Sequence, residues 1–481
     1  MWRSRLFYLV GCWILILATI KVIPLLTAIA LSEKESFQSL FSSILLTGLI
    51  GGSLVLGFRS TEKVRTPRLT LLLPVCGTVS LAIVAGLPFF FLLPDQGLWP
   101  AFFEGMSLIT TNGSSAYEGS FDNLKAISLW RALVVWVGGY FAICVTLSFL
   151  TAMNIGGLQL HQSPLPYGES EAGYPRLRST ALTLYPVYFI VTVVCGFLLW
   201  IGGLDSFEAL TLSMATISTA GLFQNYGDGL SSLWVQFILA FFMLLSMMNW
   251  DIHHARFQRR SFRLGADAEF KGTLFLVGVL ILILSVSSQS FDIQRIWHSL
   301  FAAISAVSTT GIMPQDYLDG ATGNHLTTGV LLMLAAAIGG SVVSTGGGLK
   351  QLRAIVIYRT GRAEVDRLAH PHGVSGMSLG AVEVQKRDVE AVWLLLGSFV
   401  VVLALGALSL AILGVHFQDA LSMSFTALTL SGPLTTVADP LFGGFSGLRD
   451  ADYIILTILM MVGRVETSLF LALFAKSLWR G

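Results

Sequence analysis

The sequence predicts an all-α polytopic membrane protein with about ten transmembrane helices. Hydrophobic residues make up 54% of its 481 residues and charged residues only 12%, and its mean hydropathy is +0.74, which lies far outside the range of soluble globular domains. A helix needs about 20 apolar residues to cross the hydrocarbon core of a bilayer. Stretches of about this length or longer cover residues 6–31, 36–58, 69–94, 128–152, 180–203, 231–250, 271–289, 325–357, 391–415 and 452–476.

The distribution of basic residues predicts how these stretches are oriented. If the N-terminus is cytoplasmic and the spans alternate, most of the 29 Lys and Arg residues fall in cytoplasmic segments. The exceptions on the outer side are Lys34, Lys125, Arg131, Arg295 and Arg449. By the positive-inside rule, both termini are therefore expected in the cytoplasm. The net charge of +1 gives no support for nucleic acid binding.

Four polar clusters ending in glycine interrupt the apolar sequence on the predicted outer side. Each follows an apolar segment that is too short to cross a bilayer. These clusters, called tetrads here, are Thr110-Thr111-Asn112-Gly113, Ser218-Thr219-Ala220-Gly221, Ser308-Thr309-Thr310-Gly311 and Thr429-Leu430-Ser431-Gly432. Backbone carbonyls of such loops can replace the hydration shell of a monovalent cation, and glycine permits the dihedrals that aim them inward. The tetrads therefore predict a selectivity filter with four parts.

The tetrads divide the chain into an N-terminal helix pair and four M1–P–M2 pore repeats in a pseudo-fourfold arrangement. The helix pair is expected at residues 1–67. The repeats are expected at 68–160, 161–265, 266–385 (with a glycine-rich, broken M2) and 386–481. A single cluster of this kind is also an ordinary helix C-cap or helix-packing site, but four clusters on one side of the membrane favour the filter.

Longer motifs lie around the tetrads, and through them the chain resembles the TrkH/TrkG/KtrB superfamily of potassium uptake transporters, most closely its TrkH branch. The resemblance spans nearly the whole chain. Its most specific parts are the run from Ser344 to Lys350 and the run from Gly463 to Glu466. The matching stretches are Phe103-Glu104, Trp130-Arg131, Trp136-Val137-Gly138-Gly139, Gly156-Gly157-Leu158-Gln159-Leu160, Gly339-Gly340-Ser341, Ser344-Thr345-Gly346-Gly347-Gly348-Leu349-Lys350, Leu368-Ala369-His370-Pro371 and Gly463-Arg464-Val465-Glu466.

The resemblance implies potassium uptake across the bacterial inner membrane, with K⁺ as the only metal ion and the filter as its site. It also implies a homodimer, in which each protomer has its own pore, and control by a cytoplasmic RCK-type regulator similar to TrkA. No cofactor and no enzymatic activity are expected, and nucleotide is expected only on the partner subunit. Two departures bear on selectivity: Asn112 stands where Thr is common, and the fourth tetrad reads Leu430-Ser431-Gly432-Pro433 where the family often has Asn-x-x-Gly-Pro. Gly113 favours potassium, because serine at this position accompanies sodium preference in the plant relatives.

A second glycine-rich segment predicts a gate within the eighth apolar stretch. Consecutive glycines cost a helix about 1 kcal/mol each relative to alanine, and free backbone groups at membrane depth must line a cavity or be buried in protein. The expected gate residues are Gly339, Gly340, Ser344, Thr345, Gly346, Gly347, Gly348 and Lys350, together with Arg464. By resemblance, Arg464 is an electrostatic barrier in the pore. The alternatives are a kink for close helix packing and a structural ion pair of Arg464 with another helix.

The remaining polar residues within the spans leave two other transport functions open. Coupled symport with H⁺ or Na⁺ would need carboxylates buried within spans, and Glu466 is the clear candidate. A less selective Na⁺/K⁺ permease is the other alternative. His253, His254, His370 and His372 are expected in cytoplasmic loops, exposed to solvent or at a partner interface, and do not form a metal site. Cys12, Cys76, Cys144 and Cys195 are expected to be buried apolar residues, and no function is assigned to Lys21.

Overall fold

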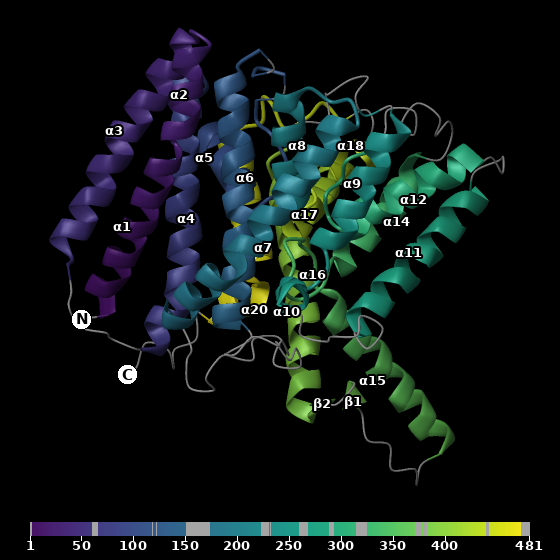
Figure 1. Ribbon diagram of the computed structural model, residues 1–481. Coiled ribbons are helices and arrows are strands. Elements are labelled where there is room, and N and C mark those ends of the chain that lie inside the picture. The colour runs from purple at the N-terminus through teal and green to yellow at the C-terminus, as the bar shows by residue number, and fades with distance from the viewer. Residues whose placement is uncertain are drawn as a thin grey trace.

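The computed structural model describes residues 2–59, 66–117, 119–121, 123–150, 174–222, 230, 232–258, 268–287, 293–313, 325–370, 378–379, 382–438 and 442–472. Within these ranges the chain is a bundle of helices that lie side by side (Figure 1). The only strands in the described part are β1 (Ser378–Leu379) and β2 (Val382–Glu383), which form a short antiparallel hairpin. The expectation of an all-α membrane protein is therefore confirmed, apart from this hairpin.

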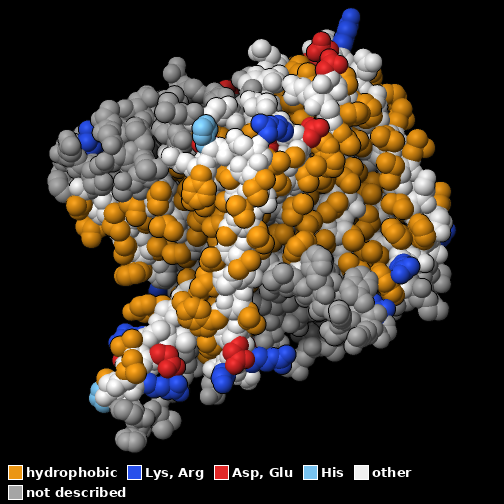
Figure 2. Space-filling model, turned by 180° about the vertical axis from the view of Figure 1, so that it is seen from behind, with side chains coloured by type: hydrophobic (Ala, Val, Ile, Leu, Met, Phe, Trp, Pro, Cys, Tyr) orange, Lys and Arg blue, Asp and Glu red, His pale blue; other side chains and the backbone are white. Residues whose placement is uncertain are grey.

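The outer faces of the helices are apolar. Leu49 of α3, Phe275 of α11 and Leu394 of α16 are 69%, 74% and 74% exposed, respectively. Figure 2 shows a broad band of hydrophobic side chains, with most of the charged side chains on that face lying toward its upper and lower ends. An exposed apolar band of this kind matches the hydrocarbon core of a membrane as the surrounding solvent.

The N-terminal helices α1 (Trp2–Ile20) and α3 (Lys34–Gly57) pack against α4 (Pro67–Leu92), whereas α2 (Val22–Ala30) packs against α3 and α6 (Lys125–Val145). Lys21 lies at the junction of α1 and α2, and its side chain is completely buried. Its ammonium donates to Ser43 Oγ at 2.6 Å, Thr47 Oγ1 at 2.9 Å and the Val84 carbonyl oxygen at 2.8 Å, which uses all three of its donors. Lys21 Nζ also lies 5.4 Å from the ring centroid of Trp130. Lys21 therefore joins the N-terminal helices to α4 and α6.

The rest of the chain repeats one pattern, in which a long helix is followed by a short helix, a tetrad and a further helix. The long helices are α4, α7 (Tyr174–Ile201), α11 (Ala268–Ser287) and α16 (Lys386–Ile412). The short helices are α5 (Leu98–Ile109), α8 (Ser206–Ile217), α12 (Ile293–Val307) and α17 (Phe417–Thr429). The helices that follow the tetrads are α6 (Lys125–Val145), α9 (Leu233–Ser246) with α10 (Trp250–Phe257), α14 (His325–Ile338) with α15 (Gln351–Ala369), and α19 (Asp450–Val465) with α20 (Thr467–Ala472).

Three minor helical segments complete the described part. They are η1 (Pro94–Gln96), η2 (Thr146–Leu150) and α18 (Leu434–Ala438). The four repeats contact each other through their helices. α15 extends beyond the ends of the other helices, with the β hairpin between it and the lower end of α16 (Figure 1). The predicted repeat boundaries remain predictions.

Not every predicted span is a continuous helix. By length and composition, seven helices of the described part can cross a membrane, or eight if the bent pair α9 and α10 counts as one. The stretch 231–250 bends by 97° between these two helices, which the sequence does not predict. The stretch 325–357 is interrupted between Ile338 and Gln351, where the glycine segment lies. The last stretch is also broken, at Glu466, which has a φ of 75°.

Candidate functional site

The four tetrads share one backbone conformation. Their second residue lies in the left-handed region, with φ of 59° at Thr111, 54° at Thr219, 61° at Thr309 and 59° at Leu430. The amide of the third residue donates to the carbonyl five positions earlier. These bonds run from Asn112 N to Ser107 O at 2.8 Å, Ala220 N to Ala215 O at 3.0 Å, Thr310 N to Ser305 O at 3.0 Å and Ser431 N to Thr426 O at 2.9 Å. This pattern is the Schellman ending of a helix, where the left-handed residue is usually glycine.

None of the four left-handed residues is glycine, and three are β-branched threonines. A β-branched residue at positive φ is an outlier, and a non-glycine residue held there costs on the order of 1–3 kcal/mol. The surrounding structure imposes this conformation four times, once in each repeat. Strain of this kind is concentrated at functional sites, so the tetrads are a candidate site by a criterion independent of sequence resemblance.

The tetrad glycines are required mainly for close packing between loops, whereas the sequence suggests that they are required for their backbone dihedrals. Only Gly113 and Gly311 have positive φ, at 82° and 77°. All four glycines instead lie in close contact with a neighbouring loop. A Cβ on Gly221 would overlap the Thr310 carbonyl oxygen, and one on Gly113 would lie 3.0 Å from Gly221 N. The ring of Pro433 also lies within 3.3 Å of the Cβ positions of Gly113, Gly221 and Gly311. The glycines therefore allow the four loops to converge.

The tetrads are buried, except for the partly exposed Gly113. Their first residue bonds back to its own helix, as Thr110 Oγ1 does to the Met106 carbonyl oxygen at 2.7 Å and Ser218 Oγ to that of Met214 at 2.7 Å. The fourth loop bonds to the first, because Gly432 N donates to the Asn112 carbonyl oxygen at 2.8 Å. The predicted filter residues therefore lie together, although more than 300 residues of sequence separate the first tetrad from the fourth.

The glycine segment 339–350, called the glycine loop here, is not helical. It contacts the third and fourth tetrads and the end of α8, which precedes the second. Gly347 N donates to Thr309 Oγ1 at 2.8 Å, and Gly348 N donates to the Thr429 carbonyl oxygen at 3.1 Å. Thr345 Oγ1 donates to the Ile217 carbonyl oxygen at 3.1 Å. The glycine loop is therefore bonded directly to the tetrads and to the helix end next to them.

Arg464, near the C-terminal end of α19, connects the glycine loop to the first tetrad. Its Nη1 donates to the Thr345 carbonyl oxygen at 2.9 Å, and its Nη2 donates to Thr111 Oγ1. Among the described residues, no carboxylate forms an ion pair with Arg464. Glu466 instead pairs with Arg353, with 2.6 Å between Oε2 and Nη2. The predicted gate residue Lys350 donates from Nζ to the Gly346 carbonyl oxygen.

Two residues that the sequence analysis missed hold the other side of the glycine loop. Glu269 Oε1 accepts from Val342 N at 3.1 Å, and Asn249 Oδ1 accepts from Val343 N at 3.0 Å. Asn249 Nδ2 donates to the second oxygen of Glu269. Glu466 is therefore not the only buried carboxylate: Glu104, Asp251, Glu269 and Asp452 are at most 2% exposed. The sequence feature that could have identified Glu269 is its position as a carboxylate directly before a predicted span, 271–289.

The expectation for the paired histidines was wrong at one of the two places. His253 and His254 lie in α10, where His254 is 6% exposed and His253 Nε2 lies 3.0 Å from the Leu245 carbonyl oxygen. They pack within the protein because α10 turns back against the bundle. His370 follows α15 and is exposed, whereas His372 lies outside the described residues. Across the part of the chain that the structure describes, no three His, Cys, Asp or Glu side chains form a candidate metal site.

The TrkH family, described as cation transport protein, matches residues 91–480. The chain is 30% identical to the Trk system potassium uptake protein TrkH of Escherichia coli K12, over 98% of both chains. It is 28% identical to the Trk system potassium uptake protein TrkI of Halomonas elongata, over 100% of this chain and 97% of that protein.

A solved structure agrees with these relationships. The crystal structure of the potassium transporter TrkH from Vibrio parahaemolyticus superimposes with a TM-score of 0.88 at 25% identity, and the match covers 100% of both chains. The family match covers more than half of the chain, and the structural match includes the N-terminal helices that precede it. The chain therefore belongs to the TrkH family of cation transport proteins, which are transporters and not enzymes.

Proposed function

We propose that this protein takes up potassium ions across the bacterial inner membrane through a filter formed by the four tetrads. The observation that carries the proposal is the left-handed conformation of Thr111, Thr219, Thr309 and Leu430. Four equivalent strained loops that converge from four short helices are the arrangement that a ring of carbonyl ligands requires. The names of the relatives, which are potassium uptake proteins, support K⁺ as the transported ion.

The glycine loop is the gate in this proposal. Its amides contact tetrad atoms at Thr309 and Thr429, so an ion that leaves the filter on this side meets the loop first. Arg464 adds a positive charge next to Thr345 and Thr111, which raises the electrostatic energy of a cation there. Opening would require the loop to leave both sets of contacts.

Regulation is proposed to come from outside the membrane. The Trk names of the relatives belong to a transport system, and this supports a cytoplasmic RCK-type regulator similar to TrkA that binds the nucleotide. We further propose a homodimer with cytoplasmic N- and C-termini. The exposed charges of α15, such as Arg367 and Glu364, are typical of a segment outside the membrane.

Coupled symport remains the second candidate, and the observation that favours it is Glu269. This buried carboxylate binds the glycine loop at Val342, so a proton on it would weaken that contact. The first candidate predicts that flux follows the potassium gradient alone, whereas symport predicts uphill movement of potassium driven by a H⁺ or Na⁺ gradient.

One experiment separates these functions. The purified chain is reconstituted in liposomes, and rubidium and sodium uptake are measured with and without a pH gradient. We expect rubidium uptake to exceed sodium uptake and to stop at its equilibrium distribution. Equal rubidium and sodium fluxes would indicate the less selective permease, and uphill rubidium accumulation with an imposed proton gradient would indicate symport.

A further inference from the structure

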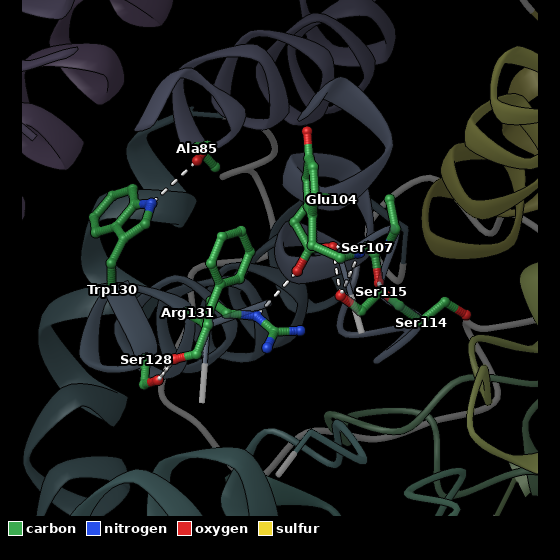
Figure 3. Close-up of polar contacts among 11 residues, drawn as sticks. Ala85, Glu104, Ser107, Ser114, Ser115, Ser128, Trp130 and Arg131 are labelled. Carbon is green, nitrogen blue, oxygen red and sulfur yellow. Dashed lines mark hydrogen bonds and ion pairs between the residues drawn. The ribbon is translucent and has the colours of Figure 1, made fainter. Parts of the chain in front are cut away.

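A buried ion pair stands behind the first tetrad. Glu104 of α5 is 0% exposed, and its Oε1 lies 3.0 Å from Nε of Arg131 in α6. Its other oxygen, Oε2, accepts from Ser115 Oγ and from Ala116 N, both at 3.0 Å. Figure 3 shows the carboxylate between the guanidinium on one side and Ser115 on the other. One side chain therefore joins the short helix, the helix that follows the tetrad and the segment between them.

The segment that Glu104 holds continues directly from the tetrad. Ser114, which follows Gly113, has its carbonyl oxygen bonded by Ser107 Oγ at 2.6 Å and its hydroxyl bonded by Asn112 Nδ2 at 2.6 Å. Glu104 acts on the next two residues of the chain. Consecutive hydrogen bonds thus fix the outer end of the first tetrad. The bonds of Ser115 and Ala116 have the Glu104 carboxylate as their acceptor, and hydrogen bonds to a charged acceptor are stronger than neutral ones.

The carboxylate is present in one repeat only. The residues nine positions before the tetrad glycines are Glu104, Leu212, Ala302 and Met423, and all four are completely buried. The bond from Ser107 to the residue after the tetrad, by contrast, recurs in the third repeat, where Ser305 Oγ donates to the Ile312 carbonyl oxygen at 2.7 Å. The first loop therefore has an additional support that the other three lack, at a position where they place apolar side chains.

We propose that the Glu104–Arg131 pair is a positioning element for ion selectivity, which fixes the first tetrad so that its carbonyls cannot follow a smaller ion. This inference rests on the proposed function of the tetrads as a potassium filter. A filter discriminates through the number and placement of its oxygen ligands, so loosening one of four loops lets the ligands close on sodium. The pair acts through Ser115 and Ala116 and does not itself contact the ion.

The test uses two variants that remove the charge in different ways. Glu104→Gln keeps the size of the side chain and removes its charge. The double variant Glu104→Met with Arg131→Met replaces both charges by apolar side chains of similar length, and replacing a whole buried pair is often tolerated where removing one partner is not. Met423→Leu, at the same position in the fourth repeat, is the matched control. Each purified variant is first examined for its thermal unfolding midpoint.

The ratio of rubidium to sodium flux into liposomes is the deciding measurement. We expect this ratio to fall by about fivefold in both variants, mostly through increased sodium flux, and to be unchanged in Met423→Leu. A purely structural role would lower both fluxes and the unfolding midpoint while leaving the ratio unchanged, and that result in either variant overturns the proposal. Equal fluxes in the unmodified protein would instead overturn the proposed function itself.

Discussion

Arg464 Nη1 donates to the carbonyl oxygen of Thr345 at 2.9 Å, across 119 residues of sequence. The position of this arginine is informative because Gly463 before it lies against the Leu428 carbonyl, as Gly138 lies against that of Ile109 in the first repeat. The next residue in the first repeat is Gly139, which contacts Ser218 of the neighbouring tetrad. Arg464 therefore occupies a position that another repeat leaves as glycine, and directs a charge toward the tetrads.

Replacing Arg464 with alanine is expected to increase rubidium flux. Even in water, two unit charges 4 Å apart repel by about 1 kcal/mol, so removal of the charge is expected to raise uptake by about fivefold or more. The measurement is initial rubidium uptake into liposomes at matched protein content. Arg367→Ala, which removes an exposed charge paired with Glu364, is the control. Unchanged or reduced flux in a folded Arg464→Ala protein would show that the arginine is structural.

Replacing Gly113 with serine is expected to reduce the preference for rubidium over sodium. Gly113 has a φ of 82°, and an L-residue in a left-handed conformation costs roughly 1–2 kcal/mol. The new Cβ would also lie 3.0 Å from Gly221 N and 3.3 Å from the Pro433 ring, so two loops must shift. The flux ratio of the two ions measures the effect. Gly119→Ser serves as the control, because its Cβ would meet nothing within 4 Å although its φ of 72° is similarly left-handed.

The sequence predicts the helices and the tetrads well because both depend on local patterns. Apolar length identifies the spans, and the short segments before the tetrads stand out because they cannot cross a bilayer. The strained position is not predictable in this way. Propensity places positive φ at glycine alone, whereas all four tetrads also have it at Thr111 or its counterpart, because tertiary contacts override local preference. Contacts such as Glu269 with Val342, 73 residues apart, leave no local pattern at all.

Replacing Thr345 with valine is expected to open the gate without changing selectivity. The substitution keeps the shape of the side chain and removes the Oγ1 hydroxyl, whose single hydrogen lies between the carbonyl oxygens of Ile217 and Ser246. A hydrogen bond of this kind contributes about 0.5–1.5 kcal/mol. Flux should rise while the rubidium-to-sodium ratio stays constant. Gly347→Ala is the contrasting variant, because its Cβ would overlap the Thr429 carbonyl oxygen and disturb the fourth tetrad. A changed ratio in Thr345→Val would mean that the glycine loop belongs to the filter.

Replacing Glu269 with glutamine is expected to release the other side of the glycine loop. Glu269 accepts from Val342 N and from Asn249 Nδ2, and hydrogen bonds to a charged acceptor contribute about 1.5–3 kcal/mol each. A neutral amide has one acceptor oxygen and cannot replace both bonds. Its NH₂ group therefore faces either Val342 N–H or Asn249 Nδ2, each of which is also a donor. We expect a lower unfolding midpoint and higher rubidium flux.

The conservative variant Asn249→Asp provides the comparison for Glu269→Gln. It places a second carboxylate against Glu269. At neutral pH, charge repulsion should weaken the contacts of these two side chains with Val342 and Val343. At low pH one carboxylate binds a proton, and the contacts should recover. Flux through Asn249→Asp is therefore expected to fall as the pH is lowered, whereas flux through Glu269→Gln should not change with pH. If the unmodified protein accumulates rubidium in response to a proton gradient and the Glu269→Gln variant does not, Glu269 carries a coupling proton and the symport function is correct. If neither variant alters flux, the loop opens without breaking the contacts at Val342 and Val343, and the gate must move about its other end, at Gly346 to Gly348.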